Sequence, residues 1–349
     1  MNAAYSSYRL QFKRPGGTSR GVLTEKETFL LCIEDGDQWG IGECAVFRGL
    51  SADDRPDYRD RLQWACDHIQ LGLETLRAEL LEWPSLVFGL EQAFRSLQAE
   101  DPMELYPSEF LEGTGLPING LVWMGTQEFM QEQIEEKLAE GYRCLKLKIG
   151  ALDWASELAL LRGLRERYPK ERLELRVDAN GAFTPEEAEE KLNTLAAFQL
   201  HSIEQPIRAG QPELLADLCR RSPVPIALDE ELIGCYTAGE AQRLLSEIRP
   251  AYIVLKPSLI GGYKASESWI RLAEALGIGW WVTSALESNI GLNAIAQWTA
   301  QLGITMPQGL GTGALFTNNI DSPLLTDGGC LWYRREHAWD LPQITSICT

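Results

Sequence analysis

The sequence predicts an α/β protein in which a modified (β/α) barrel of the TIM type follows an N-terminal α+β capping domain. Strands precede helices over about the first hundred residues, an order typical of α+β domains. After residue 117, short apolar runs alternate with longer amphipathic stretches, as repeated βα units do. About eight such units favour a closed parallel barrel over an open doubly wound sheet, whose G-x-G-x-x-G motif does not follow the first strand.

The capping domain is predicted from partial alternation of apolar and polar residues, followed by helical periodicity. The expected elements are strands at 8–13 and 28–34, a third strand after the turn at 37–43, and helices at 60–77 and 85–98. We assign residues 1–110 to this domain and expect part of the tail, about 321–349, to join it. Residues 111–320 then form the catalytic barrel.

The barrel is predicted from eight apolar runs and the amphipathic stretches between them. The expected strands are 118–124, 144–149, 173–178, 202–204, 226–229, 252–256, 280–284 and 305–308. The expected helices are about 126–140, 154–167, 185–198, 211–221, 237–247, 263–276 and 289–302. One helix start is marked clearly, because Thr184 and Pro185 supply an N-cap and a first-turn proline while Glu187 completes a capping box.

The charge and the cysteines limit the classes of function. Asp and Glu number 50 against 32 Lys and Arg, so a net charge of −18 disfavours nucleic acid and anionic membranes as partners. No apolar run reaches the roughly 18 residues of a membrane helix, and the N-terminus lacks the apolar core of a signal peptide. The eight scattered cysteines are expected to be reduced thiols of a cytoplasmic protein. Whether the protein is a monomer or a homo-oligomer stays open.

Charged residues end five consecutive strands of the predicted barrel. They are Lys148, Asp178, Glu204, Asp229 and Lys256, at successive spacings of 30, 26, 25 and 27 residues. In a parallel barrel, strand ends gather at the C-terminal mouth, where active sites lie. A single charge at a strand end is usually a cap or a turn residue, but five in succession at near-constant spacing predict a catalytic site.

The three carboxylates predict a metal site. If Asp178, Glu204 and Asp229 were buried together they would repel one another unless a cation compensated them. Oxygen ligands without His or Cys suit Mg²⁺, with Mn²⁺ as a substitute. The metal would leave positions open for an oxygen of a small-molecule carboxylate substrate.

The lysines predict proton transfer next to that metal. Lys146 and Lys148 share one face of their strand, and Lys256 stands on another strand. A lysine near another cation has a depressed pKa, which provides a neutral base near neutral pH. The metal would then stabilise the enolate formed when the base removes a proton beside a carboxylate.

This pattern resembles the enolase superfamily, in its muconate-lactonising-enzyme subgroup. The matching positions are Lys146-Leu-Lys148, Asp178-Ala-Asn180, Glu204-Gln-Pro206, Asp229-Glu230 and Lys256-Pro257. The resemblance extends over nearly the whole chain, and residues 40–51 resemble the mobile capping loop of the subgroup. Further stretches are similar to the o-succinylbenzoate synthases, namely residues 117–125, 256–262, 283–292 and 309–316.

The resemblance implies an Mg²⁺-dependent syn dehydration of 2-succinyl-6-hydroxy-2,4-cyclohexadiene-1-carboxylate to 2-succinylbenzoate, in menaquinone or phylloquinone synthesis. It implies Lys148 as the base and then the acid, and Lys256 as a cation that stabilises the anionic intermediate. N-acylamino acid racemases and dipeptide epimerases share these lysines and carboxylates, so either activity is the alternative. A binding protein that merely retains the barrel is disfavoured by the intact set.

Other residues are expected to assist. We expect Lys146, Ser284, Ser288 and Gly311 to bind the substrate. We expect Asn180 and Glu230 to orient the ligands and Arg176 to neutralise the acidic centre. The backbone N–H groups at Gly261-Gly262 are candidates for binding a carboxylate at a helix start.

Overall fold

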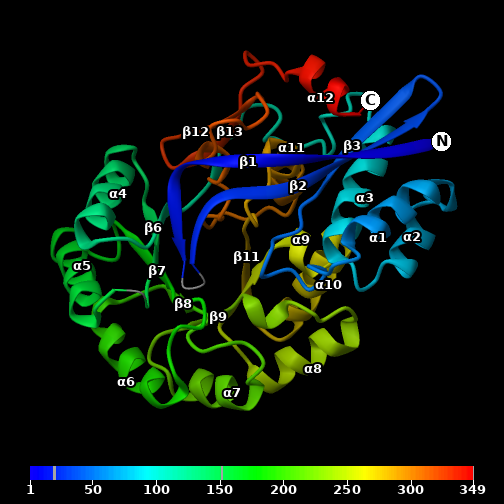
Figure 1. Cartoon of the computed structure of the whole chain (residues 1–349). Coiled ribbons are helices and arrows are strands. Elements are labelled where there is room, and N and C mark those ends of the chain that lie inside the picture. Colours follow the sequence, from blue (N-terminus) through cyan, green and yellow to red (C-terminus); the bar gives the residue numbers. More distant parts are fainter. Residues whose placement is uncertain (19–20, 151, 349) are drawn as a thin grey trace.

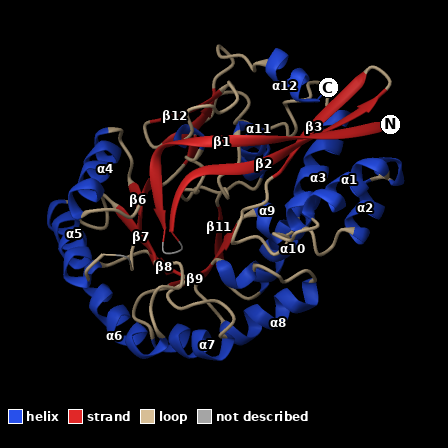
Figure 2. Cartoon of the chain, in the orientation of Figure 1, coloured by secondary structure: helices blue, strands red, loops and turns tan. Residues whose placement is uncertain are grey.

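The structure is a computed structural model that describes residues 1–18, 21–150 and 152–348, with 18 and 345–348 described by their backbone alone. A ring of parallel strands lies beside an N-terminal antiparallel sheet (Figure 1). Helices form the outside of the ring and strands its inside (Figure 2). The predicted fold class is confirmed, since the chain is a (β/α) barrel with an N-terminal α+β domain.

The N-terminal sheet is antiparallel and has the order β1 (Asn2–Thr18), β2 (Gly21–Asp35) and β3 (Gln38–Cys44). The elements that follow are α1 (Tyr58–Asp67), the 3-10 turn η1 (Ile69–Leu71), α2 (Leu73–Glu79) and α3 (Pro84–Gln98). The single helix expected at 60–77 is therefore divided. The first helix ends at Asp67, and the 3-10 turn that follows ends at Gly72, whose φ of 79° lies in the left-handed region that favours glycine.

The sheet and α3 approach each other closely at two glycines of β3. A Cβ atom on Gly40 or Gly42 would overlap the backbone of α3 at Gly89, Ala93 and Leu97. Only glycine permits this spacing, which brings β3 and the loop after it against the barrel.

The hairpin of β1 and β2 extends from this sheet across the mouth of the barrel (Figure 1). Its pairing register shifts between Gln11 and Gly16. Near its far end, Phe12 and Gly17 make isolated bridges to Phe316 and Met124 of the barrel. Residues distant in sequence therefore form one side of the barrel entrance.

The barrel contains seven assigned parallel strands in the spatial order β11-β10-β9-β8-β7-β6-β5. They are β5 (Gly120–Val122), β6 (Cys144–Lys148), β7 (Glu174–Asp178), β8 (Ser202–Glu204), β9 (Ile226–Leu228), β10 (Tyr252–Leu255) and β11 (Gly279–Val282). Where an eighth strand was predicted at 305–308, only isolated parallel bridges occur. Gln308 pairs with Ile118 and Gly309 pairs with Thr283, which closes the ring.

Helices surround the barrel and pack against its strands to form the core. They are α4 (Gln127–Ala139), α5 (Trp154–Arg167), α6 (Pro185–Leu195), α7 (Pro212–Arg221), α8 (Ala238–Ile248), α9 (Pro257–Ile260), α10 (Gly262–Ala275) and α11 (Asn289–Gln301), with 3-10 turns η2 (Ala196–Phe198), η3 (Glu230–Leu232) and η4 (Gly313–Leu315). The capping box of Thr184 and Glu187 is present as predicted. Core side chains such as Leu175 and Ile203 are fully buried, and each stabilises the fold by about 1.5–3 kcal/mol.

The C-terminal segment forms β12 (Leu324–Asp327), β13 (Cys330–Tyr333) and α12 (Leu341–Cys348). β13 pairs with β4 (Leu116–Pro117), while α12 contacts β1 and β2. The proposed division of the chain into domains stays a prediction.

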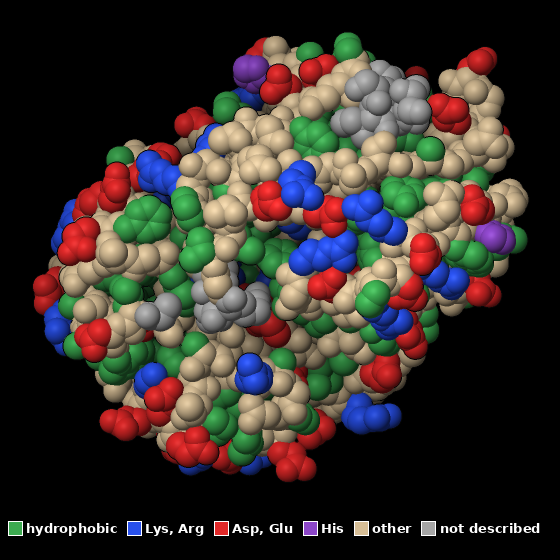
Figure 3. All heavy atoms as spheres, in the orientation of Figure 1, with side chains coloured by type: hydrophobic (Ala, Val, Ile, Leu, Met, Phe, Trp, Pro, Cys, Tyr) green, Lys and Arg blue, Asp and Glu red, His purple; other side chains and the backbone are tan. Residues whose placement is uncertain are grey.

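Among the described side chains, the expectation of reduced cysteines is wrong at Cys32, which is disulfide-bonded, and the side chain of Cys348 lies outside the described residues. The cysteines described as free are Cys44, Cys66, Cys144, Cys219, Cys235 and Cys330. Among the described residues, none of the helices has the length and apolar character needed to cross a membrane. Acidic side chains are spread around the visible face of the molecule (Figure 3).

Candidate active site

The strand register brings the predicted charges to one level of the barrel mouth. Lys148 at the end of β6 pairs with Asp178 at the end of β7, and Asp178 pairs with Glu204 at the end of β8. Asp229 and Lys256 directly follow β9 and β10. The three carboxylates are almost completely buried, with at most 2% of each residue exposed.

Lysine ammonium groups are the cations that contact these carboxylates. Lys146 Nζ lies 2.9 Å from Asp178 Oδ2 and 2.5 Å from Glu204 Oε2, so it stands between the two acids. Lys148 Nζ donates to Asp178 Oδ2 at 2.6 Å, and Lys256 Nζ donates to Asp229. Three lysines and three carboxyl groups therefore meet in one buried cluster.

This pairing shifts the pKa values in opposite directions. Burial, followed by repulsion from Asp178, raises the pKa of Glu204 well above its usual value. Burial also opposes ionisation of Asp178, but the ammonium groups of Lys146 and Lys148 outweigh it and hold the pKa of Asp178 well below its usual value. The carboxylates likewise raise the pKa of Lys146 against the effect of burial. Lys146 is thus held as an ammonium in this arrangement.

The donor set suits a hard divalent cation. In the described part of the chain, no three His, Cys, Asp and Glu side chains already stand in an arrangement that could hold a metal ion. The donors at the barrel mouth are nevertheless all carboxylate oxygens, which Mg²⁺ prefers. Glu204 Oε1 is buried without a hydrogen-bond partner among the described residues, and Oε2 has the ion-pair contact with Lys146 as its one partner there. A buried carboxylate in that condition is costly unless a cation binds it.

Asn180 links the lysine of β6 to a further acid. Its Oδ1 accepts a hydrogen bond from Lys148 Nζ at 2.8 Å, and its Nδ2 donates to Glu230 Oε1 at 3.0 Å. Its backbone N–H donates to Asp178 Oδ1 at 2.9 Å, and its φ of 44° lies in the left-handed region that Asn tolerates. The structure therefore places Asn180 in contact with Lys148, Asp178 and Glu230, and the role of Asn180 and Glu230 in orienting metal ligands stays a prediction.

Gln205 is a buried residue of the site that the sequence analysis missed. Its Oε1 accepts the backbone N–H of Asp229 at 3.3 Å, and its Nε2 donates to Glu231 Oε2 at 3.3 Å. It thereby ties the end of β8 to the start of the segment that carries Asp229. The available signal was a glutamine between a strand-ending acid and a proline.

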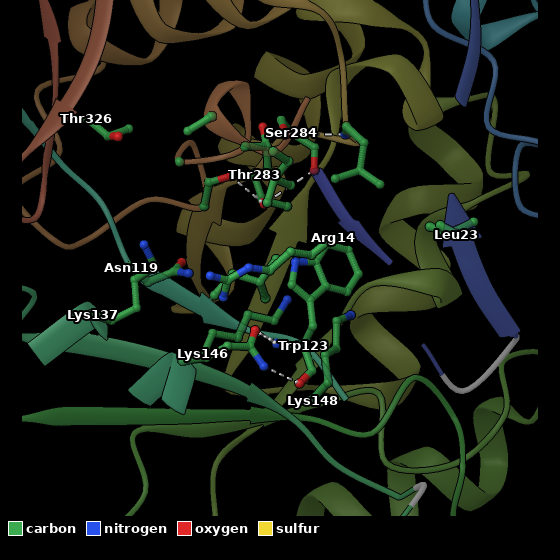
Figure 4. A pocket seen from close by; sticks show the side chains of 18 of the residues that line it. Arg14, Leu23, Asn119, Trp123, Lys137, Lys146, Lys148, Thr283, Ser284 and Thr326 are labelled. Atoms are coloured by element: carbon green, nitrogen blue, oxygen red, sulfur yellow. Dashed lines mark hydrogen bonds between the residues drawn. The ribbon is translucent and has the colours of Figure 1, made fainter. Parts of the chain in front are cut away.

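A pocket of about 540 Å³ opens above the charged cluster. Lys146, Lys148 and Lys256 line it, and Ser284 and Gly311 form part of its wall, as the sequence predicted. Figure 4 shows the side chains of Lys146, Lys148 and Ser284 directed toward this space. The lining residues missed from the sequence include Arg14 and Leu23 of the β1–β2 hairpin, and Asn119 and Trp123 on either side of β5.

Three expected contributions to the site are not found. Ser288 does not line the pocket but caps α11, and its Oγ donates to Glu43 at 2.5 Å. Arg176 does not neutralise the acids, because its guanidinium donates to Glu174 Oε1 and to the carbonyl of Pro307. The N–H groups after Gly261-Gly262 already bind a carboxylate of the protein, that of Glu91.

A parallel barrel whose mouth gathers three buried carboxylates and three lysines beneath an N-terminal domain defines an enzyme of the enolase type. The family model described as "Enolase C-terminal domain-like" matches residues 129–333. The chain therefore belongs to the enolase superfamily.

Its relatives include enzymes of two activities. The chain is 48% identical to the o-succinylbenzoate synthase of Desulfotalea psychrophila, over 95% of this chain and 98% of that protein. It is 28% identical to the L-Ala-D/L-Glu epimerase of Bacillus subtilis, over 80% of this chain and 79% of that protein. The crystal structure of MenC from Desulfotalea psychrophila superposes with a TM-score of 0.85 at 45% identity and covers 95% of this chain and 99% of that one. A muconate lactonizing enzyme at 21% identity shares the fold, with a TM-score of 0.78 and 99% coverage of both chains.

Proposed function

We propose that this chain is an o-succinylbenzoate synthase, which converts 2-succinyl-6-hydroxy-2,4-cyclohexadiene-1-carboxylate to 2-succinylbenzoate and water. The observation that carries the proposal is the 48% identity to a protein of that name over nearly the full length of both chains. The pocket supports the proposal, because its volume of about 540 Å³ and its lysine-lined base suit a small carboxylate.

Lys148 acts as both base and acid in this proposal. Its Nζ removes the proton from the ring carbon next to the carboxylate. The ring C–O bond then breaks, and the departing hydroxyl takes a proton from Lys148 and leaves as water while the ring becomes aromatic. Because the proton and the hydroxyl leave from the same face, one lysine serves both steps.

Asp178, Glu204 and Asp229 would hold Mg²⁺, with Mn²⁺ as a substitute. When bound, the metal supplies positive charge to the enediolate oxygens that proton removal creates. Asp178 and Glu204 can bind the metal together only if Lys146 moves out from between them. The Lys146 ammonium then binds the substrate carboxylate. Lys256 provides a second fixed positive charge, from β10.

The finer biological context is also a proposal. We infer that the enzyme works in the cytoplasm, in menaquinone or phylloquinone synthesis. We further propose that its domains divide near residues 110 and 321, so that the barrel carries the carboxylates and lysines while the capping domain closes the pocket.

The proposal is tested by turnover of the cyclohexadiene substrate, followed by proton NMR with Mg²⁺ and with EDTA. We expect the aromatic signals of 2-succinylbenzoate to appear with Mg²⁺ and to be lost with EDTA. An enzyme that forms no aromatic product at saturating Mg²⁺ would exclude the proposed reaction.

Epimerisation is the second candidate. It is favoured by the presence of lysines on two different strands at the pocket base, Lys148 on β6 and Lys256 after β10, since an epimerase needs a base on each face of the α-carbon. Incubation with L-Ala-L-Glu and with N-succinyl amino acids in deuterated water would reveal it by loss of the α-proton signal. Exchange much faster than aromatisation would make epimerisation the main activity.

A further inference from the structure

A cluster of buried charges lies behind one wall of the pocket, where the N-terminal sheet meets the barrel. It consists of Lys26 on β2, Glu43 on β3 and Glu287 between β11 and α11, which are 7%, 0% and 0% exposed. Among the described residues, the pocket lining includes Ser284, Ala285 and Leu286 but none of these three charges. The cluster can therefore act on the site only through the residues that it holds.

Glu43 binds the start of α11. Its Oε1 accepts the backbone N–H of Ser288 at 2.9 Å, and its Oε2 accepts Ser288 Oγ at 2.5 Å and the N–H of Gly291 at 3.0 Å. A further bond from Thr28 Oγ1 at 2.8 Å fixes the carboxylate on its own sheet. A carboxylate in this position satisfies N–H groups that have no partner inside the helix and complements the helix dipole. The N-terminal domain thus holds a barrel helix at its first turn.

Glu287 binds the loop that precedes this helix. Its Oε2 accepts the N–H of Ala285 at 2.7 Å, and its Oε1 accepts Ser258 Oγ at 2.6 Å. Ser258 lies two residues after Lys256, so this carboxylate connects the pocket wall to the segment that carries a site lysine. Within the wall, Leu286 has a φ of 65°, a conformation that is unfavourable for a leucine and must be maintained by its surroundings.

Lys26 provides the positive charge between these acids. Its Nζ is buried and has no hydrogen-bond partner among the described residues, yet it lies in the field of both Glu43 and Glu287. A buried ammonium is costly unless opposite charges compensate it. Its place in the cluster indicates that the two acids belong to one assembly rather than acting as separate caps.

We propose that Glu43 and Glu287 are positioning residues, which hold the pocket wall at 284–288 and the segment after Lys256, so that docking of the N-terminal sheet sets the shape of the substrate pocket. This inference depends on the proposed function only where its test measures turnover of the proposed substrate. Its geometric part concerns the backbone amides of the wall and is measurable without any substrate.

Glu91 supplies a matched control. It is also a buried acid of the N-terminal domain, on α3, and it accepts the N–H groups of Tyr263 and Lys264 at the start of α10, at 2.5 Å and 3.4 Å. It does not line the active-site pocket. Glu43→Gln and Glu91→Gln therefore remove the same type of interaction from two barrel helices, only one of which follows the pocket wall.

The kinetic test compares KM and kcat of the two variants with the wild type. We expect Glu43→Gln to raise KM by about ten-fold or more with kcat within about three-fold, and Glu91→Gln to leave KM within about two-fold. Glu287→Gln should also lower kcat, because it releases Ser258 beside Lys256. Equal KM values in the Glu43 and Glu91 variants, at equal loss of stability, would show a structural role alone and overturn the proposal.

Hydrogen exchange tests the geometry independently of activity. We expect Glu43→Gln to accelerate amide exchange in residues 285–291 by about ten-fold while residues 263–264 stay unchanged, and Glu91→Gln to do the reverse. Unchanged exchange at 285–291 in Glu43→Gln would overturn the proposal. If the wild type fails to turn over the substrate, the proposed function fails while this measurement still decides the inference. If Glu43→Gln does not fold, Ser288→Ala is the second variant, because it removes one hydrogen-bond donor to Glu43. It should accelerate amide exchange in the same residues and raise KM about three-fold. Unchanged exchange and unchanged KM in Ser288→Ala would overturn the proposal.

Discussion

Replacement of Lys146 by methionine tests the charge balance of the site directly. Lys146 is 6% exposed and contacts both Asp178 and Glu204. Methionine keeps most of the side-chain volume, so the change is mainly the loss of one positive charge. Asp178 retains Lys148, but Glu204 loses its only ion-pair contact among the described residues. Removal of one partner from a buried ion pair costs about 3–5 kcal/mol, and we expect the free energy of unfolding to fall by that amount in EDTA.

The same variant should respond strongly to Mg²⁺, because a bound divalent cation replaces the missing ammonium. At a Mg²⁺ concentration of about 100 times Kd, binding returns about 2.7 kcal/mol of stability. The assay is urea unfolding followed by tryptophan fluorescence, with EDTA and with Mg²⁺. Lys137→Met is the control, since Lys137 also lines the pocket but pairs with Glu140 on the helix surface, where a loss below about 1 kcal/mol is expected. A Lys146→Met protein as stable as the wild type in EDTA, or one that Mg²⁺ stabilises no more than the wild type, would refute the reasoning.

Three further predictions concern single groups. Lys148→Ala should abolish dehydration while circular dichroism stays that of the wild type, and near-normal turnover would contradict its role as the base. Asp229→Asn should shift the Mg²⁺ dependence of turnover to about ten-fold higher concentration or more, and an unchanged titration curve would argue against ligation. Burial raises the pKa of Asp53 to about 6, although Ser85 donates two hydrogen bonds to it. The unfolded chain releases this proton at lower pH than the folded chain, so stability falls as the pH rises through the interval between the two pKa values and is constant above it. Asp53→Asn should remove this loss, about 3 kcal/mol, and a stability difference from the wild type that does not vary between pH 4 and 7 would disprove it.

The barrel and its charged mouth were predictable because they depend on local spacing. Each βα unit repeats at nearly constant length, and strand ends in a parallel barrel meet at one mouth. Lys148, Asp178 and Glu204 therefore appear at adjacent register positions, as their spacing indicated. The division of the helix expected at 60–77 was harder to predict from the sequence, because a single glycine is often tolerated within a helical pattern.

The positions of Arg176 and Ser288 depend on how deep a side chain lies in the barrel and which way it points. The spacing of residues along the sequence predicts neither. Arg176 faces the barrel interior like Asp178, but two residues of strand place it about 6.6 Å deeper. There its guanidinium stacks on Trp281, with Cζ 4.6 Å from the ring centre, and pairs with Glu174. A serine after a strand can face the pocket or cap the next helix, and Ser288 does the latter because Glu43 meets it from another domain. Likewise, Arg14 reaches the pocket because the β1–β2 hairpin contacts the barrel, through the Arg14–Glu136 ion pair and the bridge between Gly17 and Met124. These contacts join residues distant in sequence, for which the local sequence carries no signal.

The closure of the barrel at Gln308 and Gly309 has a consequence for divergence among related enzymes. At this seam, two bridges replace a strand ladder, and side-chain bonds such as that from the N–H of Val282 to Gln308 Oε1 at 2.7 Å assist them. Residues beyond the seam, including Gly311 and Thr312, face the pocket without belonging to a paired strand. This stretch can be lengthened, shortened or changed in sequence without breaking a ladder of backbone hydrogen bonds. Changes of length or sequence that alter the pocket are therefore tolerated more readily here than in β6, β7 and β8, whose paired register places the charged residues.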